Sequence, residues 1–272
     1  MGFLKKSKIT VAVVSDTHIG STVALCPQNM RLDDGQTINL STPQKWLLDN
    51  WNDFWKRAKE LDNKEIYIFL LGDTFDNIHH GTTQLWSTNE ADWKRAALEL
   101  FDIPKRLAKH IFSIRGTTVH TKGGGSLDEE VGIILGSVPD SLGNRSSWYR
   151  RVYVNDVLFD LAHKGPLGRL PWTTGNMLNR LPYEIMAKCV KERTEIPQVA
   201  LRSHNHTYST SSEGTPIFTV SVPAWQLCTE YGYNLNPARI SDIGGLLFEC
   251  WEGKYEYHRV LYAPEVEKAW RE

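Results

Sequence analysis

Five polar clusters rich in Asp and His hold the side chains of this chain that could do chemistry. They are Ser15-Asp16-Thr17-His18, Gly72-Asp73-Thr74-Phe75-Asp76, Gly116-Thr117-Thr118-Val119-His120, Ala162-His163-Lys164 and Ser203-His204-Asn205-His206. A mixed set of carboxylates and imidazoles suits Mn, Fe, Zn, Ni or Co. The clusters contain enough of both to bind two cations, and a pair of divalent cations is a common device for hydrolysing phosphate esters.

Each cluster alone is a weak signal. A single Asp-x-His or His-x-His arises by chance, and a lone His at a strand end is more often a hydrogen-bonded structural residue. Here all five clusters follow a predicted strand, in an order that an α/β fold can bring to one sheet edge. Their joint occurrence favours a site with two metals over five unrelated structural residues.

The first half of the chain alternates strands and helices. Short apolar, β-branched runs predict buried strands at 8–15, 65–71 and 111–115. Helical spacing of apolar residues predicts helices at 42–61, 91–109 and 126–135, the last with a capping box at Ser126–Glu129 and a stop at Gly136. This alternation predicts parallel strands with right-handed crossovers. The tryptophans of the 42–61 helix are expected in the core.

The second half changes character. Strands are expected at 148–154 and 157–162, joined by a two-residue turn at Asn155-Asp156, and a helix follows at 173–192. Further strands are expected at 198–202, 217–222, 243–251 and 255–262. No repeat or linker divides the chain, so we expect a single domain spanning residues 1–272.

Composition excludes several classes of protein. The formal net charge of −1 gives no global basic field of the kind that marks a dedicated duplex-DNA binder. The four cysteines lack C-x-x-C spacing, which favours free thiols in a reducing compartment. The apolar run at 9–14 is too short for a secretory signal or a membrane span. We therefore expect a cytoplasmic enzyme without a membrane partner, and its oligomeric state stays open.

As a set, the motifs resemble the calcineurin-like metallophosphoesterase superfamily. The pattern of that superfamily is D-x-H, G-D-x-x-D, G-N-H-[DE], H and G-H-x-H, and the resemblance runs from the first strand to about His206. The spacing from Gly116 to His120 and the run Pro223-Ala224-Trp225-Gln226 resemble phage-type members. The resemblance implies an α/β fold in the form of a four-layer αββα sandwich, with two mixed β-sheets flanked by helices.

The resemblance also implies a ligand set. Asp16, His18 and His206 would hold the first metal, His163 and His204 the second, and Asp73 would bridge them. The cofactors would be two divalent metal ions, Mn foremost, with Fe, Zn, Ni or Co as alternatives. The chain departs from the family pattern at Thr117, which replaces Asn, at His120, which two inserted residues displace, and at Ser203, which replaces Gly. Thr117, Asn77 or water would then complete the second metal.

The mechanistic hypothesis is an in-line attack on phosphorus by a hydroxide that bridges the two cations. His120 is the candidate catalytic residue, as the general acid that protonates the leaving group, because imidazole has a pKa close to the working pH. Two rival interpretations stay open: a loop His fixed by hydrogen bonds, or a replacement for the missing Asn ligand. The other histidines outside the motifs are given no catalytic role.

The sequence leaves the substrate-binding residues unknown. A phosphodiester in a nucleotide or nucleic acid is the foremost expected partner. The alternatives are a phosphomonoesterase acting on a nucleotide or phosphoprotein, and a non-catalytic binding protein with a degraded metal site. Trp172 and Trp225 could stack on a nucleobase, although packing beneath the rim of the site is the more common role for Trp.

Overall fold

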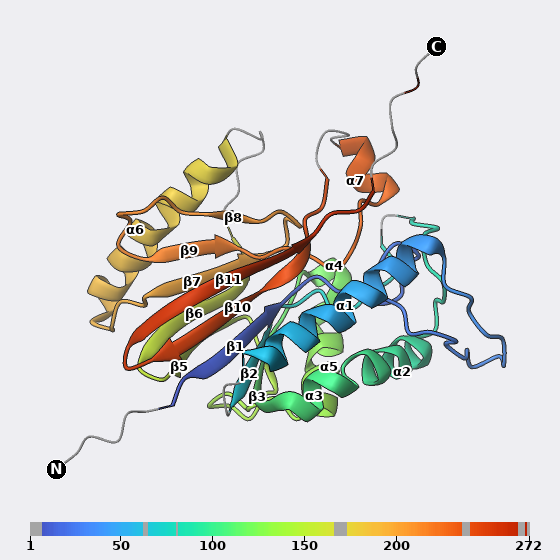
Figure 1. Cartoon of the computed structure of the whole chain (residues 1–272), viewed down its shortest axis with the longest axis horizontal. Coiled ribbons are helices and arrows are strands. Elements are labelled where there is room, and N and C mark those ends of the chain that lie inside the picture. Colours follow the sequence, from blue (N-terminus) through green and yellow to red (C-terminus); the bar gives the residue numbers. More distant parts are fainter. Residues whose placement is uncertain are drawn as a thin grey trace.

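Two β-sheets packed face to face form the centre of the molecule, with helices on their outer sides (Figure 1). The computed structural model describes residues 7–61, 65–79, 81–165, 173–235, 240–265 and 270. The first sheet has the strand order β11-β10-β1-β2-β3-β4, and the second has the order β5-β6-β7-β9-β8. Both sheets mix parallel and antiparallel pairs. The predicted four-layer architecture is confirmed.

The element bounds are as follows. The first sheet contains β1 (Ile9–Val14), β2 (Ile66–Leu70), β3 (Ala108–Ile114), β4 (Ser146–Ser147), β10 (Ile243–Trp251) and β11 (Lys254–Tyr262). The second contains β5 (Tyr149–Val154), β6 (Val157–Lys164), β7 (Val199–Ser203), β8 (Ser209–Thr210) and β9 (Phe218–Ser221). The helices are α1 (Thr42–Glu60), α2 (Glu90–Leu100), α3 (Asp102–Leu107), α4 (Thr118–Thr121), α5 (Ser126–Leu135), α6 (Thr174–Glu192) and α7 (Glu230–Leu235), with a 3₁₀ turn η1 (Gly123–Gly125).

The predicted parallel pairing of the first strands is confirmed. β1 pairs with β2, and β2 pairs with β3, all in parallel. The pairing continues beyond the strands, because the His18 N–H donates to the Asp73 carbonyl over 3.1 Å and the Ile19 N–H donates to the Thr74 carbonyl over 2.8 Å. The loops that carry the first two motifs are therefore held side by side.

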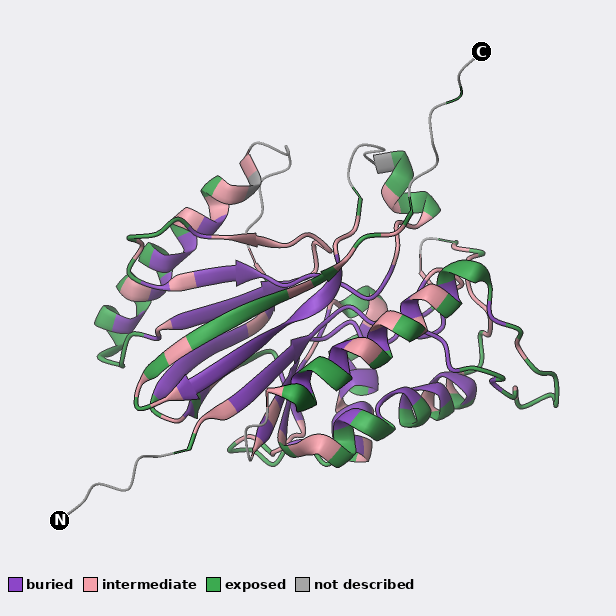
Figure 2. Ribbon diagram, in the orientation of Figure 1, coloured by how far each residue is buried: buried purple, intermediate pink, exposed green. Residues whose placement is uncertain are grey.

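Three apolar layers hold the sandwich together. Both sheets bury one face in the middle layer, where Phe69, Phe159 and Phe248 meet. Helices α1, α2 and α5 cover the outer face of the first sheet, and α6 covers the second. Figure 2 shows the result as strands that are mostly buried, apart from the exposed β11, and helices that are buried along one side. Trp51 and Trp55 of α1 lie in the core as predicted, each only 1% exposed.

The helix expected at 91–109 is wrong in its extent. The chain forms two helices, α2 and α3, that meet at Phe101, and β3 starts at Ala108 rather than at 111. Pro104 explains the break, because proline lacks the N–H that would bond to the carbonyl four residues earlier and its ring clashes with that carbonyl. This carbonyl, of Leu100, accepts a hydrogen bond from the Trp51 indole at 3.1 Å instead.

The helix at Ser126–Leu135 has the predicted bounds, but the predicted capping box is absent. Its N-cap is Gly125, with φ of 81°, and no side chain caps it. Asp128 instead accepts the Gly116 N–H at 2.7 Å, and Glu129 accepts the Ser146 N–H at 2.8 Å. Asp128 thus holds a loop of the site, and Glu129 holds the start of β4.

Two predicted turns are confirmed. Gly136 ends α5 with φ of 72°, and the Asn155-Asp156 turn has positive φ at both residues, as a type I′ hairpin requires. Cys26, Cys189 and Cys250 are buried free thiols. Among the described residues, every helix is too short or too polar to cross a lipid bilayer.

Candidate metal centre

The six predicted metal ligands lie at the carboxyl ends of strands from both sheets. Asp16 and His18 follow β1, Asp73 follows β2, and His163 is the penultimate residue of β6. His204 and His206 follow β7. Crossing from one sheet to the other, the His204 N–H donates to Asp16 Oδ2 at 3.3 Å. The sandwich thus brings together motifs that are almost 190 positions apart in the chain.

The backbone at these ligands is strained. Five of the six have left-handed φ values: Asp16 (52°), His18 (41°), Asp73 (49°), His204 (77°) and His206 (52°). Such values are uncommon for residues other than Gly, and each destabilises the fold by about 1–3 kcal/mol. Strain of this kind persists where a site needs side chains in one place.

Asp16, His18 and His206 form what we call the first ligand group. Asp16 Oδ1 lies 3.3 Å from His206 Nε2 and 3.8 Å from His18 Nε2, and the two imidazole nitrogens are 3.1 Å apart. When atoms bind one ion at about 2.0–2.2 Å, the distances between those atoms are similar to the three distances found here. These three atoms can therefore surround a single cation.

Asp73, His163 and His204 form the second ligand group. Asp73 Oδ2 lies 2.9 Å from His163 Nε2 and 3.8 Å from His204 Nδ1. The groups adjoin, because Asp16 Oδ1 is 4.0 Å from His163 Nε2. Within the described residues, Asp73 clusters with the second group. Its bridging role stays a prediction.

Two buried atoms of these groups have no hydrogen-bond partner among the described residues. They are Asp16 Oδ1 and His163 Nε2. The 2.9 Å contact between His163 Nε2 and Asp73 Oδ2 brings opposite charges together without the geometry of a hydrogen bond. An unsatisfied buried polar atom costs about 1–3 kcal/mol. A cation beside both atoms would remove that cost, so the residues present fit a bound metal.

The electrostatics of the site also suit a cation. Burial lowers the pKa of His18, but hydrogen bonding to Asp16 and Asp76 outweighs burial and raises the pKa to about 10. Burial likewise opposes the charged form of His163, yet Asp73 and Asp16 raise its pKa to about 9. Burial raises the pKa of Asp16, but the positive charge of His163 and the interactions with His18 and His206 together outweigh burial and lower the pKa well below its usual value. The carboxylates thus hold positive charge at the place where a metal would supply it.

Three residues for which the sequence predicted no role lie around His18. Asp76 Oδ1 lies 3.0 Å from His18 Nδ1 and accepts a hydrogen bond from Gln226 Nε2 at 3.1 Å. His79 Nε2 is 3.5 Å from the same oxygen. A carboxylate on the far nitrogen of a ligating His fixes its tautomer and orientation. The signal for Asp76 was present in the sequence, since it closes the Gly-Asp-x-x-Asp motif.

His120 lies beside the first ligand group. Its Nδ1 is 2.5 Å from the Asp76 carbonyl, and its ring meets that of His18 edge-on with centroids 4.5 Å apart. Burial, then the positive charge of His18, lower the pKa of His120 to about 4. Among the described residues it clusters with His18 and Asp76 rather than with the second group. It is therefore not placed as a substitute for the missing Asn ligand.

Thr117, which stands where the family has Asn, clamps Asp73. Its N–H donates to Asp73 Oδ1 at 2.6 Å, and its hydroxyl lies 3.1 and 3.2 Å from the two carboxylate oxygens. Asn77, the other expected stand-in, donates its amide to the Val119 carbonyl at 2.9 Å and so holds α4. The second group thus has three ligands where the family pattern supplies more.

Gly116 is required for the clamp on Asp73. A Cβ atom there would lie 2.0 Å from Asp73 Oδ1, closer than any real contact. Gly72, with φ of 87°, approaches the same turn, and a Cβ there would lie 2.5 Å from the Gly116 nitrogen. Both glycines of the motifs therefore serve the close approach of two ligand loops.

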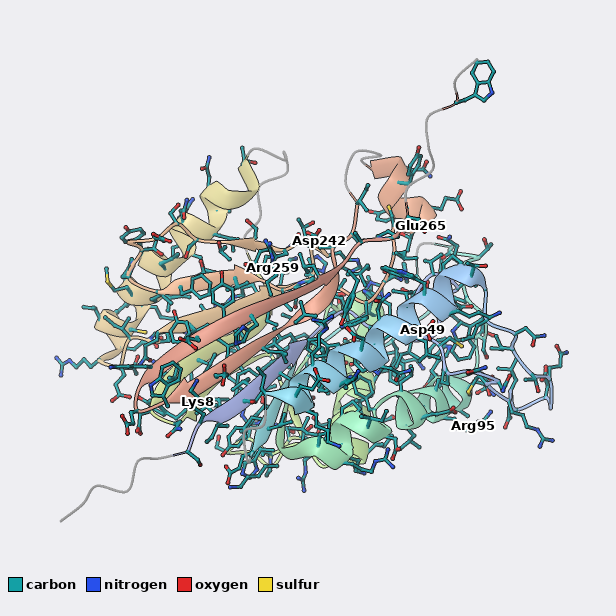
Figure 3. The ribbon with its side chains drawn as sticks, viewed as in Figure 1. Lys8, Asp49, Arg95, Asp242, Arg259 and Glu265 are labelled. Carbon is teal, nitrogen blue, oxygen red and sulfur yellow. The ribbon has the colours of Figure 1, made fainter. Side chains whose placement is uncertain are left out.

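The segment after His206 is fixed by Asp242. The Asp242 N–H donates to the His206 carbonyl at 2.8 Å, and Asp242 Oδ2 accepts the Tyr208 N–H at 2.7 Å. Asp242 and Arg259 are labelled in Figure 3; the Arg259 guanidinium, on β11, lies 5.1 Å from the centre of the Tyr208 ring. Both sheets thus hold this ligand loop.

Trp225 has the more common of its two expected roles, packing beneath the rim of the site rather than stacking on a nucleobase. Its side chain is fully buried and packs edge-on against Trp51, with centroids 4.9 Å apart. The short run around it reads as a loop in the sequence, but the chain passes beneath the rim of the site into the core. Trp172 lies outside the described residues.

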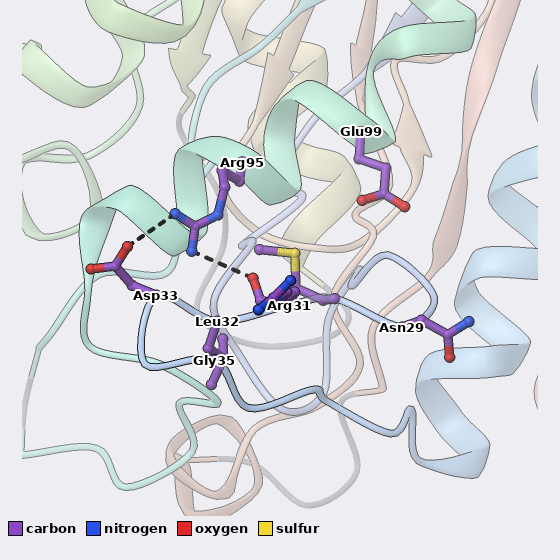
Figure 4. A pocket seen from close by; sticks show the side chains of 8 residues that line it. Asn29, Arg31, Leu32, Asp33, Gly35, Arg95 and Glu99 are labelled. Carbon is purple, nitrogen blue, oxygen red and sulfur yellow. Dashed lines mark hydrogen bonds and ion pairs between the residues drawn. The ribbon is translucent and has the colours of Figure 1, made fainter.

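A shallow pocket lies apart from the ligand groups, against α2 (Figure 4). Arg95 lies within it, paired with Asp33 at 3.4 Å and bonded to the Arg31 carbonyl at 3.4 Å. The lining residues are Asn29, Met30, Arg31, Leu32, Asp33, Gly35, Arg95 and Glu99. They include no metal-ligating histidine, so this pocket has no part in the metal centre.

Comparison with known proteins finds only distant likeness. No protein-family model matches the chain, and no curated protein is similar to it in sequence. Similar solved structures include Vacuolar Protein Sorting 29 of Cryptosporidium parvum (12% identity, 95% of this chain and 100% of that chain, TM-score 0.42). They also include Vps29 of Entamoeba histolytica complexed with zinc (12%, 93% and 98%, 0.38) and Yfce, a phosphoesterase from E. coli (12%, 88% and 91%, 0.42). At these TM-scores the likeness decides nothing about activity.

Proposed function

We propose that this chain is a dinuclear metal-dependent phosphoesterase, a hydrolase of phosphate esters. One observation carries the proposal: two groups, each of one carboxylate and two imidazoles, adjoin at 4.0 Å through Asp16 Oδ1 and His163 Nε2. Both of these atoms are buried and lack hydrogen-bond partners within the described residues. If these residues only formed structural ion pairs, both atoms would be expected to have hydrogen-bond partners.

The six ligands are proposed to hold two divalent cations, Mn foremost, with Fe, Zn, Ni or Co as alternatives. When bound, such ions lower the pKa of water and neutralise charge on phosphoryl oxygens. The chain itself supplies the negative charge of Asp16 and Asp73, and Asp76 sets the orientation of His18.

His120 is proposed as the general acid. The contact of its Nδ1 with the Asp76 carbonyl leaves Nε2 as the nitrogen that can exchange a proton with a leaving group. The lowered pKa, about 4, makes the imidazolium a strong acid that is populated less as pH rises. The acid route should therefore weaken from low to high pH.

For the substrate, we propose a phosphodiester in a nucleotide or nucleic acid, hydrolysed in the cytoplasm. The support is the resemblance of the motif spacing to phage-type members of the superfamily. A phosphomonoester is the alternative substrate. A non-catalytic binding protein is the second candidate function, and the observation that favours it is Thr117 in place of the Asn ligand.

The test is hydrolysis of bis-p-nitrophenyl phosphate and p-nitrophenyl phosphate by metal-free protein with added Mn. The proposal expects turnover that EDTA abolishes and a faster rate on the diester. Faster monoester hydrolysis would reverse the order of the substrates. A preparation that stays inert at saturating Mn would favour the binding protein.

A further inference from the structure

Three hydrogen-bond donors converge on one backbone carbonyl beneath the metal ligands. The Leu71 carbonyl accepts from Ser15 Oγ at 3.2 Å, from Ser203 Oγ at 3.1 Å and from His163 Nδ1 at 2.5 Å. Ser15, Leu71 and Ser203 each stand at the end of a strand, just before the turn that carries a ligand. The four residues therefore join all four ligand-bearing strands.

This set of hydrogen bonds to the Leu71 carbonyl, which we call the knot, links the two sheets. Ser15 and Leu71 belong to the first sheet, whereas Ser203 and His163 belong to the second. All four residues are buried, with Leu71 and Ser203 fully so. Hydrogen bonds are stronger in such a medium, and an unmade one is more costly. The knot thus fixes how the sheets meet at the ligands.

The knot also sets the tautomer and the rotation of one ligand. Because a carbonyl oxygen only accepts, His163 Nδ1 donates its proton to the Leu71 carbonyl, and Nε2 is the nitrogen that faces Asp73 and would bind a metal. Ser203 Oγ lies 3.0 Å from the same Nδ1 and 3.2 Å from the His163 carbonyl. The hydroxyl thereby contacts the imidazole from the side that faces away from the metal.

We propose that Ser203 is a positioning residue for the second metal, acting through His163, with Ser15 as its partner on the Leu71 carbonyl. This deepens the proposed function and rests on it. The superfamily pattern has Gly at this position, so the hydroxyl is a feature of this chain. It serves the ligand group in which Thr117 replaces Asn. A site with fewer ligands depends more on the preorganisation of those that remain.

The test compares Ser203→Ala with Ser221→Ala in the full chain. Ser221 lies on β9, the strand next to β7, is 1% exposed, and has a hydroxyl without a hydrogen-bond partner among the described residues. It controls for loss of a buried hydroxyl that positions nothing. Metal-free protein is titrated calorimetrically with Mn, and the Co(II)-loaded protein is followed by its visible absorption.

Ser203→Ala should weaken binding of the second equivalent of Mn by about tenfold or more, the usual effect of losing a partner of a ligating His. It should also change the Co(II) spectrum, while the first equivalent binds as before. Ser15→Ala should have a smaller effect of the same kind, because the contact between Ser203 and His163 remains. Ser221→Ala should alter neither equivalent.

An unchanged second equivalent in Ser203→Ala would overturn the proposal. So would equal weakening of both equivalents with a matching fall in the melting temperature of the metal-free protein, which is the mark of a merely structural role. Ser203→Gly, the family residue, replaces the Ala variant if that fails to fold. If the unaltered chain binds no Mn, the proposed function fails. If the unaltered chain binds two equivalents of Mn and Ser203→Ala binds both with the same affinities, only the positioning role fails.

Discussion

The two ligand groups differ in how completely the chain provides for them. The first group has every residue of the family pattern, and the far nitrogen of His18 is held by Asp76, which Gln226 holds in turn. The second group lacks the Asn ligand, and Thr117 occupies Asp73 Oδ1 with its N–H. The chain supports the second group through the ring nitrogen of His163 that faces away from the metal, because His163 Nδ1 donates to the Leu71 carbonyl.

This difference teaches that one centre can be secured in two ways. A complete set of ligands holds its metal through the number of its donor atoms. A set that lacks one ligand depends instead on how rigidly the remaining donor atoms are held in place. We therefore expect two metal sites of unequal affinity, with the second the weaker and more exchangeable. Four changes should break or sharpen this comparison, from the largest expected effect to the smallest.

Asp16→Asn should have the largest effect, because Asp16 Oδ1 lies 3.3 Å from His206 Nε2 and 4.0 Å from His163 Nε2. Turnover of bis-p-nitrophenyl phosphate should fall by more than about a hundredfold, beyond the range for partner residues of ligands. The matched control is Asp102→Asn, at a carboxylate of α3 that is paired with Arg106. A variant with near-normal turnover would remove Asp16 from the centre.

His120→Asn should slow hydrolysis of esters with alkyl leaving groups by about a hundredfold, the usual contribution of a general acid. Esters of p-nitrophenol should lose far less, because that leaving group departs without a proton. His110→Asn, at a β3 histidine whose ring packs on Tyr67, serves as the control and should change neither rate. Equal losses for both leaving groups would contradict the acid role.

Thr117→Asn should supply the Asn of the superfamily pattern and tighten the second equivalent of Mn by about tenfold. Thr117 is the N-cap of α4, a position that accepts Asn well, so the helix should survive. Calorimetric titration measures the change, with the exposed neighbour Thr118→Asn as the control. Unchanged or weaker binding would show that the second group is not short of a ligand.

The smallest effect concerns pH. The raised pKa values of His18 and His163, about 10 and about 9, favour the folded state while both residues hold protons. That stabilisation is complete below the ordinary His value of 6.5 and is lost as pH rises through 9 to 10. Urea unfolding of metal-free protein should show a falling free energy of unfolding from pH 6.5 to 9.5.

Saturating Mn should remove this slope, because the metal replaces the protons on the ligating imidazoles. The difference between the two conditions is the quantity to measure. The same slope with and without Mn would mean that His18 and His163 do not bind the metal.

The strands and the ligands were predictable because they rest on local signals. A buried apolar run that ends in Asp or His indicates both a strand and the ligand that follows it, as at Val14 to Asp16 and at Leu71 to Asp73. The parallel order then decides which strand ends adjoin. The sequence therefore indicated both the layers and the set of residues that meet.

The residues around the ligands were not predictable in this way. Gln226 reaches Asp76 across 150 positions, and Ser203 reaches Leu71 across 132. No periodicity or spacing records such contacts. Glu129 shows the converse failure, because the carboxylate that the capping-box pattern assigns to the helix start instead accepts the Ser146 N–H. Tertiary hydrogen bonds override the local preference there.

The most direct test of the central claim is anomalous diffraction from crystals of the chain soaked in Mn. Two peaks are predicted, one among Asp16, His18 and His206 and a weaker one among Asp73, His163 and His204. No peak at either group in saturating Mn, or peaks bound elsewhere on the molecule, would contradict the account.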